Sequence, residues 1–463
     1  MNKFGNKFNS LFASMLGVTL CGALFMGAVP GVNSQLTVQA EDVNPVPVQY
    51  TDENGDEYDY EYSDAEYEAL AKQEEIVIDA AFVAKYDEHI ATTSIKGPFC
   101  ALRWALSDAS AAKKITINKA DYPVIADPSG RRLMIYSNKE LDLGGATLKR
   151  SRTENLIVVG NPDVDAKGYA YTNIKIHNGT IDGGKADAGL CRFARVENLT
   201  LDRLNFVSFG KHAAEFAALN NASITNCTFQ KPNYNVKSKK SGYEALSFDM
   251  TSNDADFEKY GPADYLTCKN VTIYNCTFKD LYRGLGSHHY INKKYYEKIV
   301  IDKCKFVNIE DTAVECAGWI NSKIKNCTFN KVGFGIDFKQ PATSIKNSKT
   351  YSAYNCNSTI ENNTFVIRKS GNKTFNSAIR VGGFTLDKKT NGVKKGIYYL
   401  NKFTVKNNTV KGKSTYCIIV DYTKNTVVTG NKTSGAAVRG ISFWYAPGHV
   451  DKNNVDTSKK KTK

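Results

Sequence analysis

The chain has 463 residues, and 61 Lys and Arg against 47 Asp and Glu give it a net charge of +14. With 42% hydrophobic residues it can bury a core, so wholesale disorder is excluded. No apolar run of 18 or more residues follows residue 40, so we expect no membrane span. The charge is uneven, because residues 41–95 carry −14 and residues 96–463 carry +26.

Residues 1–40 have the features of a secretory signal peptide. Lys3 and Lys7 precede an apolar stretch from Leu11 to Val29, and small residues around Ala40 suit a cleavage site. We therefore expect a secreted, extracellular protein. Secretion argues against nucleic acid as the partner of the basic body, so we expect an acidic polysaccharide instead.

Residues 41–97 are predicted to form an acidic linker followed by a helix. The helix is expected from Ser63, where Glu66 completes a capping box. Its apolar face is expected to pack against the rest of the protein through Leu70, Ile76, Val77 and Phe82.

A six-residue pattern recurs through residues 98–456. Its clearest copies are Ile224–Phe229, Ile273–Phe278, Ile301–Phe306 and Ile324–Phe329, each with Cys in fourth place. Spacings as short as 22–25 residues indicate one solenoid coil with occasional longer loops. Short period-2 runs rich in Ile, Val, Thr and Phe predict three strands per coil. We predict an all-β, right-handed parallel β-helix of about eleven coils, followed by a basic tail at 457–463.

This repeat resembles that of the pectin-lyase-like superfamily of secreted β-helix proteins. The segment from Phe99 to Tyr122 is similar to the capping helix and first strand of that family. The asparagine ladder of the family, at the turn between its second and third strands, corresponds to Asn362, Asn407, Asn431 and Asn453. The resemblance implies a carbohydrate site along one strand and its flanking loops. The signatures of polygalacturonases and pectate lyases are absent, so it does not determine the reaction.

The cysteines of the repeat are predicted to be buried, free thiols. Cys227, Cys276, Cys304 and Cys327 replace one another in successive or nearby coils. Disulfides between in-register parallel neighbours are geometrically awkward, so we expect a stack of thiols rather than bridges or a metal site.

Another strand of each coil carries charge. Its segments alternate apolar and other residues: Ala214–Ala217, Leu246–Asp249, Leu285–His288, Val314–Ala317, Ile336–Lys339, Ile379–Gly382, Ile418–Asp421 and Ile441–Trp444. First and third positions are predicted to point inward, and second and fourth positions outward. Long insertions flank this strand at 230–244, 250–270, 289–299, 340–358, 366–377 and 383–403. Because the insertions are rich in Tyr and Lys, we predict that they form the walls of a glycan groove.

Two pairs of outward residues are candidates for chemistry. Glu315 and Asp337 are expected on neighbouring coils about 5 Å apart, where carboxylates can share a proton, hold Ca²⁺ or act in a glycosidase. Asp249 and His288 have the same spacing, which suits a carboxylate that orients an imidazole. The predicted catalytic residues are Asp249, His288, Glu315 and Asp337. The predicted substrate-binding residues are His212, Glu215, Glu244, Arg283, Lys339 and Arg380.

These residues favour a monomeric enzyme that cleaves an acidic polysaccharide. Hydrolysis is slightly preferred to lyase chemistry, because the strand carries more carboxylates than a metal-free lyase requires. No cofactor is required for this chemistry, and Ca²⁺ is the one metal ion for which the carboxylates are candidate ligands. The alternative is a non-catalytic glycan-binding or adhesin-type β-helix.

Overall fold

The computed structural model describes residues 49–51, 57–59, 64–91, 96–128, 131–151, 155–160, 166–237, 243–252, 261–287, 293–340, 355–368, 376–387, 389 and 394–458. The described strands belong to one compact unit that begins at Pro47. The predicted signal peptide lies outside the described residues.

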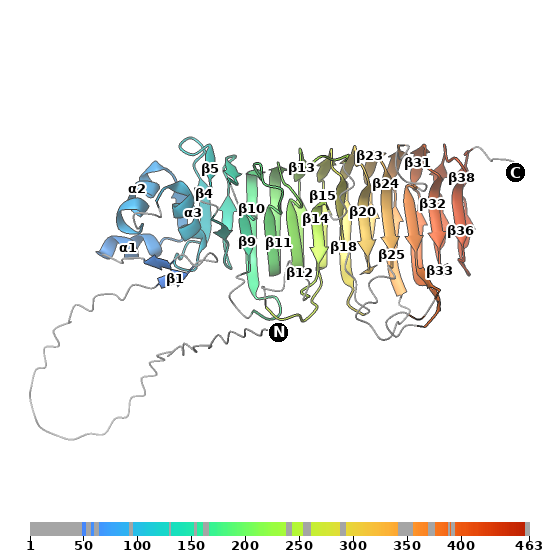
Figure 1. Ribbon diagram of the computed structural model, residues 1–463, viewed down its shortest axis with the longest axis horizontal. Helices are drawn as coiled ribbons and strands as arrows, with labels where there is room; N and C mark the ends of the chain where they lie inside the picture. The colour runs from blue at the N-terminus through green and yellow to red at the C-terminus, as the bar shows by residue number, and fades with distance from the viewer. Residues whose placement is uncertain are drawn as a thin grey trace, which may run out of the picture. The chain divides into compact units, whose positions relative to one another are not determined.

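The strands stack in three parallel columns, so the predicted right-handed parallel β-helix is confirmed (Figure 1). Column 1 contains β6 (Leu133–Met134), β9 (Ile157–Val159), the starts of β11 (Cys191–Val207) and β12 (Ala214–Thr225), β14 (Glu244–Asp249), β17 (Arg283–Ser287), β20 (Thr312–Ala317), β24 (Phe334–Lys339), β27 (Ile379–Gly382), β32 (Tyr416–Asp421) and β36 (Arg439–Trp444).

Column 2 contains β3 (Glu75–Ile78), β4 (Lys114–Ile117), β7 (Glu140–Asp142), part of β10 (Tyr171–Asp182), parts of β11 and β12, β15 (Lys269–Tyr274), β18 (Tyr296–Asp302), β22 (Lys323–Lys325), β25 (Asn355–Glu361), β30 (Leu400–Lys406), β34 (Val427–Thr429) and β37 (Val450–Lys452). The short strands β21 (Trp319–Ile320) and β33 (Thr423–Lys424) extend it.

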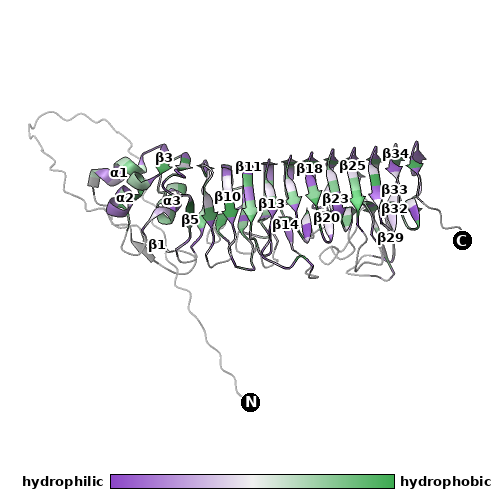
Figure 2. Cartoon of the chain, turned by 90° about the horizontal axis from the view of Figure 1, so that it is seen from above, coloured by the Kyte–Doolittle hydropathy of each residue, from purple (hydrophilic) through white to green (hydrophobic). Residues whose placement is uncertain are grey.

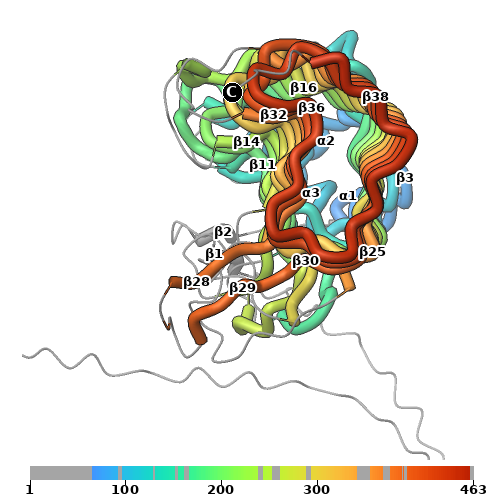
Figure 3. Tube along the Cα trace, turned by 90° about the vertical axis from the view of Figure 1, so that its right-hand side faces the viewer, coloured from blue at the N-terminus to red at the C-terminus, as the bar shows by residue number. Residues whose placement is uncertain are grey.

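Column 3 contains β5 (Val124–Ala126), β8 (Thr147–Lys149), the ends of β10 and β11, β13 (Thr228–Gln230), β16 (Thr277–Lys279), β19 (Lys305–Val307), β23 (Thr328–Val332), β26 (Thr364–Ile367), β31 (Thr409–Gly412), β35 (Lys432–Thr433) and β38 (Val455–Asp456). Seen end-on, the columns surround one core (Figure 3). Two antiparallel hairpins stand apart from them: β1 (Gln49–Thr51) with β2 (Glu57–Asp59), and β28 (Phe384–Leu386) with β29 (Gly396–Tyr398).

The prediction of one helix with an apolar face from Leu70 to Phe82 is wrong. Helix α1 (Asp64–Ala71) is followed by strand β3 and then by helix α2 (Ala80–His89). Ile76 and Ile78 are buried, whereas Val77 is 48% exposed, because a strand alternates its faces. Since β3 pairs with β4, column 2 also begins before helix α3 (Pro98–Leu106) and not after it.

Stacked aromatic rings fill the core under column 3. Phe206, Phe229, Phe278, Phe306, Phe329 and Phe365 lie face to face with centroid separations of 4.4–4.9 Å. This spacing follows from strand stacking at about 4.8 Å, which repeats each inward residue once per coil. Hydrophobic and hydrophilic residues accordingly share the same strands (Figure 2).

The turn between columns 2 and 3 holds the predicted polar stack, with one correction. Cys227, Cys276, Cys304 and Cys327 are buried free thiols, as predicted, and so are all other described cysteines. The ladder continues through Asn363, Asn408, Asn431 and Asn454, whose side-chain amides hydrogen-bond in series at 3.0 Å. Asn362, Asn407 and Asn453 are instead the preceding residues, which have φ of 57°, 56° and 54°. Consecutive asparagines at this turn produced the one-residue error, because Asn also favours the left-handed conformation.

Candidate functional site

The predicted register of the charged strand is confirmed by strand pairing in column 1. Glu215 pairs with Ser247, Ser247 with Gly286, and Gly286 with Glu315. The same row continues through Asp337, Arg380, Ile419 and Ser442. We call the outward side of column 1, from Arg192 to Trp444, the column 1 face.

Several charged residues on this face are buried more deeply than outward positions of a solenoid usually are. Glu215 is 2% exposed, Glu244 1% and Glu315 8%. Because a buried charge needs a partner, these side chains form ion pairs with residues of neighbouring coils.

The first cluster is built around Glu215. Arg192 of the preceding coil donates twice to Glu215 Oε2, at 2.6 and 3.0 Å. His212 Nε2 lies 3.4 Å from Glu215 Oε1, and its Nδ1 lies 2.9 Å from the backbone carbonyl of Glu244. Both ring nitrogens of His212 therefore face oxygen acceptors.

The second cluster is built around Glu315. Arg283 Nε donates to Asp311 Oδ2 at 2.8 Å, and its Nη1 lies 3.1 Å from Glu315 Oε2. Lys339 Nζ lies 2.6 Å from Glu315 Oε1 and 3.2 Å from Asp337 Oδ2. Burial alone would lower the pKa of Arg283 and Lys339, but the adjacent carboxylates raise both pKa values above their usual range. The ammonium group of Lys339 therefore contacts both Glu315 and Asp337, the predicted pair of neighbouring carboxylates.

The third cluster joins Arg380 to Asp421, whose closest contact is 2.8 Å between Nη2 and Oδ2. Burial raises the pKa of Asp421 even though Arg380 acts in the opposite direction. Gly382 lies beside this carboxylate, and a Cβ there would be 2.0 Å from Asp421 Oδ1. A glycine is therefore required for the carboxylate to lie over the backbone of the preceding coil.

The other predicted pair is described only in part. Asp249 accepts a hydrogen bond from Ser247 Oγ at 3.0 Å, while His288 lies outside the described residues. Among the residues that the structure describes, no group of three or more His, Cys, Asp or Glu is arranged to hold a metal ion.

Sequence reasoning missed three members of these clusters as site residues. Arg192 occurs in Cys191-Arg192-Phe193-Ala194, which has the same alternation as the later segments, so the pattern extends one coil earlier. Asp421 stood in the predicted outward column but was not selected. Asp311 precedes its strand and is 5% exposed, and no periodicity marks a residue of that turn.

The loops beside the face contain structural contacts as well as exposed aromatic rings. Buried Arg195 anchors residues 261–267 by donating to Asp264 at 2.9 Å. Tyr296, expected in a glycan-binding wall, is fully buried and belongs to the core. At the C-terminal end, Trp444 is 37% exposed and Tyr445 is 64% exposed. These two rings, rather than Tyr296, are accessible to a sugar.

Comparisons with known proteins reveal the fold. No protein-family model and no curated protein matches the chain. Among solved structures, the surface adhesin PfbA of Streptococcus pneumoniae is 17% identical with a TM-score of 0.58. The match covers 78% of this chain and 86% of the adhesin chain. The tailspike protein of E. coli bacteriophage HK620 is 12% identical with a TM-score of 0.57, and the match covers 91% of this chain and 72% of the tailspike chain.

An exopolygalacturonase from Thermotoga maritima is 12% identical with a TM-score of 0.51, and the match covers 77% of this chain and 87% of that enzyme. Within the described residues, no helix is both long and apolar enough to cross a membrane. An exopolygalacturonase, a phage tailspike protein and a surface adhesin thus share this architecture. The chain has the pectin-lyase-like parallel β-helix fold.

Proposed function

We propose that the protein is a secreted glycoside hydrolase that binds a polysaccharide along the column 1 face. The observation that carries the proposal is the pair of carboxylates Asp337 and Asp421 on this face, which contact the cations Lys339 and Arg380. Two carboxylates that flank a glycosidic bond are the usual machinery of glycoside hydrolysis.

Asp337 suits the role of the carboxylate that activates water or attacks the sugar. Its Oδ2 contacts Lys339, while its Oδ1 is buried and has no hydrogen-bond partner among the described residues. A buried acceptor without a partner is costly, so an incoming hydroxyl or water that donates to Oδ1 would be favoured.

Asp421 is the best candidate for the proton donor. A general acid must hold its proton near the working pH, and burial raises the pKa of Asp421. Asp421 lies two coils beyond Asp337 and two residues further along the strand, so the two backbones are about 12 Å apart. Because the coil of Arg380 lies between them, the two carboxylates are further apart than a retaining pair on adjacent coils, and an inverting mechanism requires such a wider separation.

The charge balance of the face favours hydroxyl-rich sugars rather than a dense polyanion. Arg192, Arg283, Lys339 and Arg380 each already contact a carboxylate. We therefore propose that this face forms hydrogen bonds with sugar hydroxyls. Acidic groups would be recognised by a second surface, on the outer side of columns 2 and 3.

Binding without turnover is the second candidate function. It is favoured by the pairing of Glu215 with Arg192 and of Glu315 with Arg283 and Lys339, since a catalytic carboxylate must be released from such contacts to react. Incubation of the purified protein with neutral and acidic polysaccharides separates the alternatives. New reducing ends without unsaturated products support hydrolysis, unsaturated products support a lyase, and retention on a glycan without any product supports binding alone.

A further inference from the structure

The outer faces of columns 2 and 3 carry many lysines from β15 onward. These lysines have no carboxylate within ion-pair distance among the residues that the structure describes: Lys269, Lys298, Lys305, Lys323, Lys331, Lys402, Lys411, Lys413, Lys432 and Lys452. We call them the lysine surface. All except the half-buried Lys269 are exposed.

The five carboxylates on the strands of columns 2 and 3 from β15 to β38 are half as many as these ten lysines: Glu297, Asp302, Glu361, Asp451 and Asp456. Asp302 Oδ2 already lies 3.4 Å from Lys325 Nζ, and Glu361 Oε2 lies 2.9 Å from Lys406 Nζ. The strands of columns 2 and 3 from β15 to β38 contain no arginine. The surface therefore carries excess positive charge in the form of ammonium groups alone.

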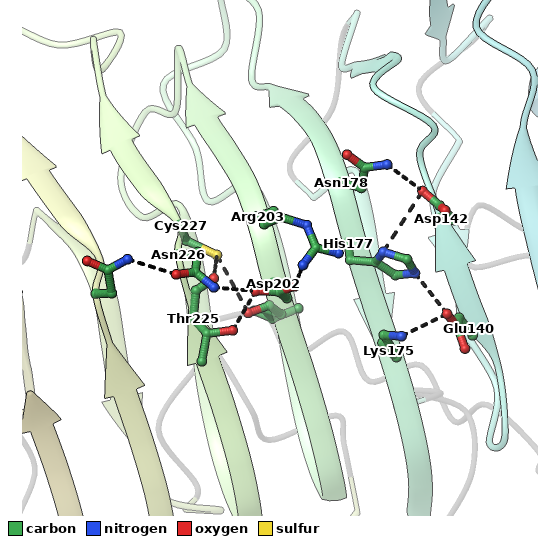
Figure 4. A network of polar contacts seen from close by, with 12 residues as sticks. Glu140, Asp142, Lys175, His177, Asn178, Asp202, Arg203, Thr225, Asn226 and Cys227 are labelled. Atoms are coloured by element: carbon green, nitrogen blue, oxygen red, sulfur yellow. Dashed lines mark hydrogen bonds and ion pairs between the residues drawn. The ribbon is translucent and has the colours of Figure 1, made fainter.

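The N-terminal half of column 2 is built differently (Figure 4). Lys175 Nζ and His177 Nε2 both contact Glu140 Oε1, at 2.8 and 2.9 Å. Asp202 accepts from Thr225 at 2.6 Å and pairs with Arg203. The same outward positions are thus charge-paired in one half of the solenoid, and a surplus of lysine is specific to the other half.

This surplus has an energetic cost in the free protein. Coils stack at about 4.8 Å, and the screening length at physiological ionic strength is about 8 Å, so ammonium groups on nearby coils repel one another. A polymer with regularly spaced negative charges removes that repulsion and gains attraction at each step along the axis.

We propose that the lysine surface binds an acidic polysaccharide, separately from the column 1 face. Lysine contacts carboxylate or sulfate groups as a point charge and needs no fixed geometry, which suits a flexible anionic glycan. Single-stranded nucleic acid is less suited, because such sites combine basic groups with aromatic rings on which bases stack. Tyr274, a half-buried aromatic residue among these lysines, already accepts a hydrogen bond from Lys303 Nζ at 3.0 Å. The surface would hold an acidic glycan while the column 1 face acts on sugar residues.

The test measures binding of the full chain to polygalacturonate over a range of salt concentrations. One variant carries Lys305→Gln, Lys323→Gln, Lys411→Gln and Lys432→Gln. A control with the same net charge carries Lys119→Gln, Lys149→Gln, Lys167→Gln and Lys185→Gln, which are exposed lysines of the N-terminal half. We expect the first variant to bind about ten-fold more weakly with a shallower salt dependence, and the control to bind like the unmodified protein.

Equal losses in both variants, or binding that is insensitive to salt, would overturn the proposal. Equally tight binding of an oligothymidylate of matched charge would overturn the assignment to glycan. Asp337→Asn separates this inference from the proposed hydrolysis. It is expected to abolish product formation while leaving salt-dependent binding unchanged, so failure of one proposal is distinguishable from failure of the other.

Discussion

Lys339 reaches back across one coil to Glu315, with 2.6 Å between Nζ and Oε1. The same ammonium contacts Asp337 on its own strand. The two carboxylates, which sequence spacing made candidates to share a proton or a calcium ion, are thereby held around a cation supplied by the protein. This contact links the stability of the column 1 face to its chemistry.

Replacing Lys339 with Met should lower the free energy of unfolding by about 3 kcal/mol, because Asp337 would lose the cation that its Oδ2 contacts and Glu315 would keep only Arg283 as a partner. Lys339→Arg keeps the charge and serves as the control. Urea unfolding at pH 7 measures both variants. A loss equal to that of Lys339→Arg would contradict the assigned role.

Asp421→Asn should flatten the dependence of stability on pH in mildly acidic solution. Burial raises the pKa of Asp421 above its ordinary value of 3.8, so the folded state binds more protons than the unfolded state between the two pKa values. The free energy of unfolding therefore falls as the pH rises through this interval, and removal of the carboxyl group removes that slope. Denaturant titrations from pH 3.5 to pH 7 test this, and parallel curves for both proteins would argue against a buried, proton-retaining Asp421.

The cysteines should resist thiol reagents until the protein unfolds. Burial raises the pKa of Cys268 and Cys356 to about 12, and thiolate is the reactive form. Labelling with Ellman's reagent should be slow in buffer and complete in guanidinium chloride. Because the unfolded thiols ionise near their ordinary value of 9.0, stability should also fall as the pH rises above 9. Rapid labelling of native protein would exclude a closed thiol stack.

Asn408→Ala should be more damaging than Asn407→Ala. Asn408 is fully buried; it accepts from the Asn363 amide at 3.0 Å and donates to the Ile360 carbonyl at 3.0 Å, so its loss should cost about 2–3 kcal/mol. Asn407 is exposed with a φ of 56°, and alanine there should cost about 1 kcal/mol. Thermal or urea unfolding compares the stability losses of the two variants. A larger loss for Asn407→Ala would indicate that Asn407, and not Asn408, belongs to the asparagine ladder.

The architecture and the register of column 1 could be predicted because a solenoid repeats one inward pattern in every coil. The alternation in Ile336–Lys339 and Ile379–Gly382 fixes which residues face outward, and the pairing of Asp337 with Arg380 follows. Local ambiguity explains the errors. Paired asparagines shifted the ladder by one residue, and the run Glu75–Ile78 contains apolar residues that suit either helix or strand.

The ion pairs could not be predicted from the same pattern. A period of two assigns a face to a residue but not the direction in which a long side chain extends. Arg283 reaches Asp311 and Glu315 of the next coil, whereas Lys339 reaches back to the preceding one. Asp311 lies in a turn, where no periodicity marks its burial. The predicted role of His288 stays a prediction.

The central claim, hydrolysis on the column 1 face, is tested most directly by reducing-end release from a panel of neutral and acidic polysaccharides. The unmodified protein should release reducing ends from at least one glycan without forming unsaturated products. Asp337→Asn should reduce the rate at least about 100-fold while circular dichroism and glycan retention stay unchanged. Full activity of Asp337→Asn, or glycan retention with no product from the unmodified protein, would contradict the account.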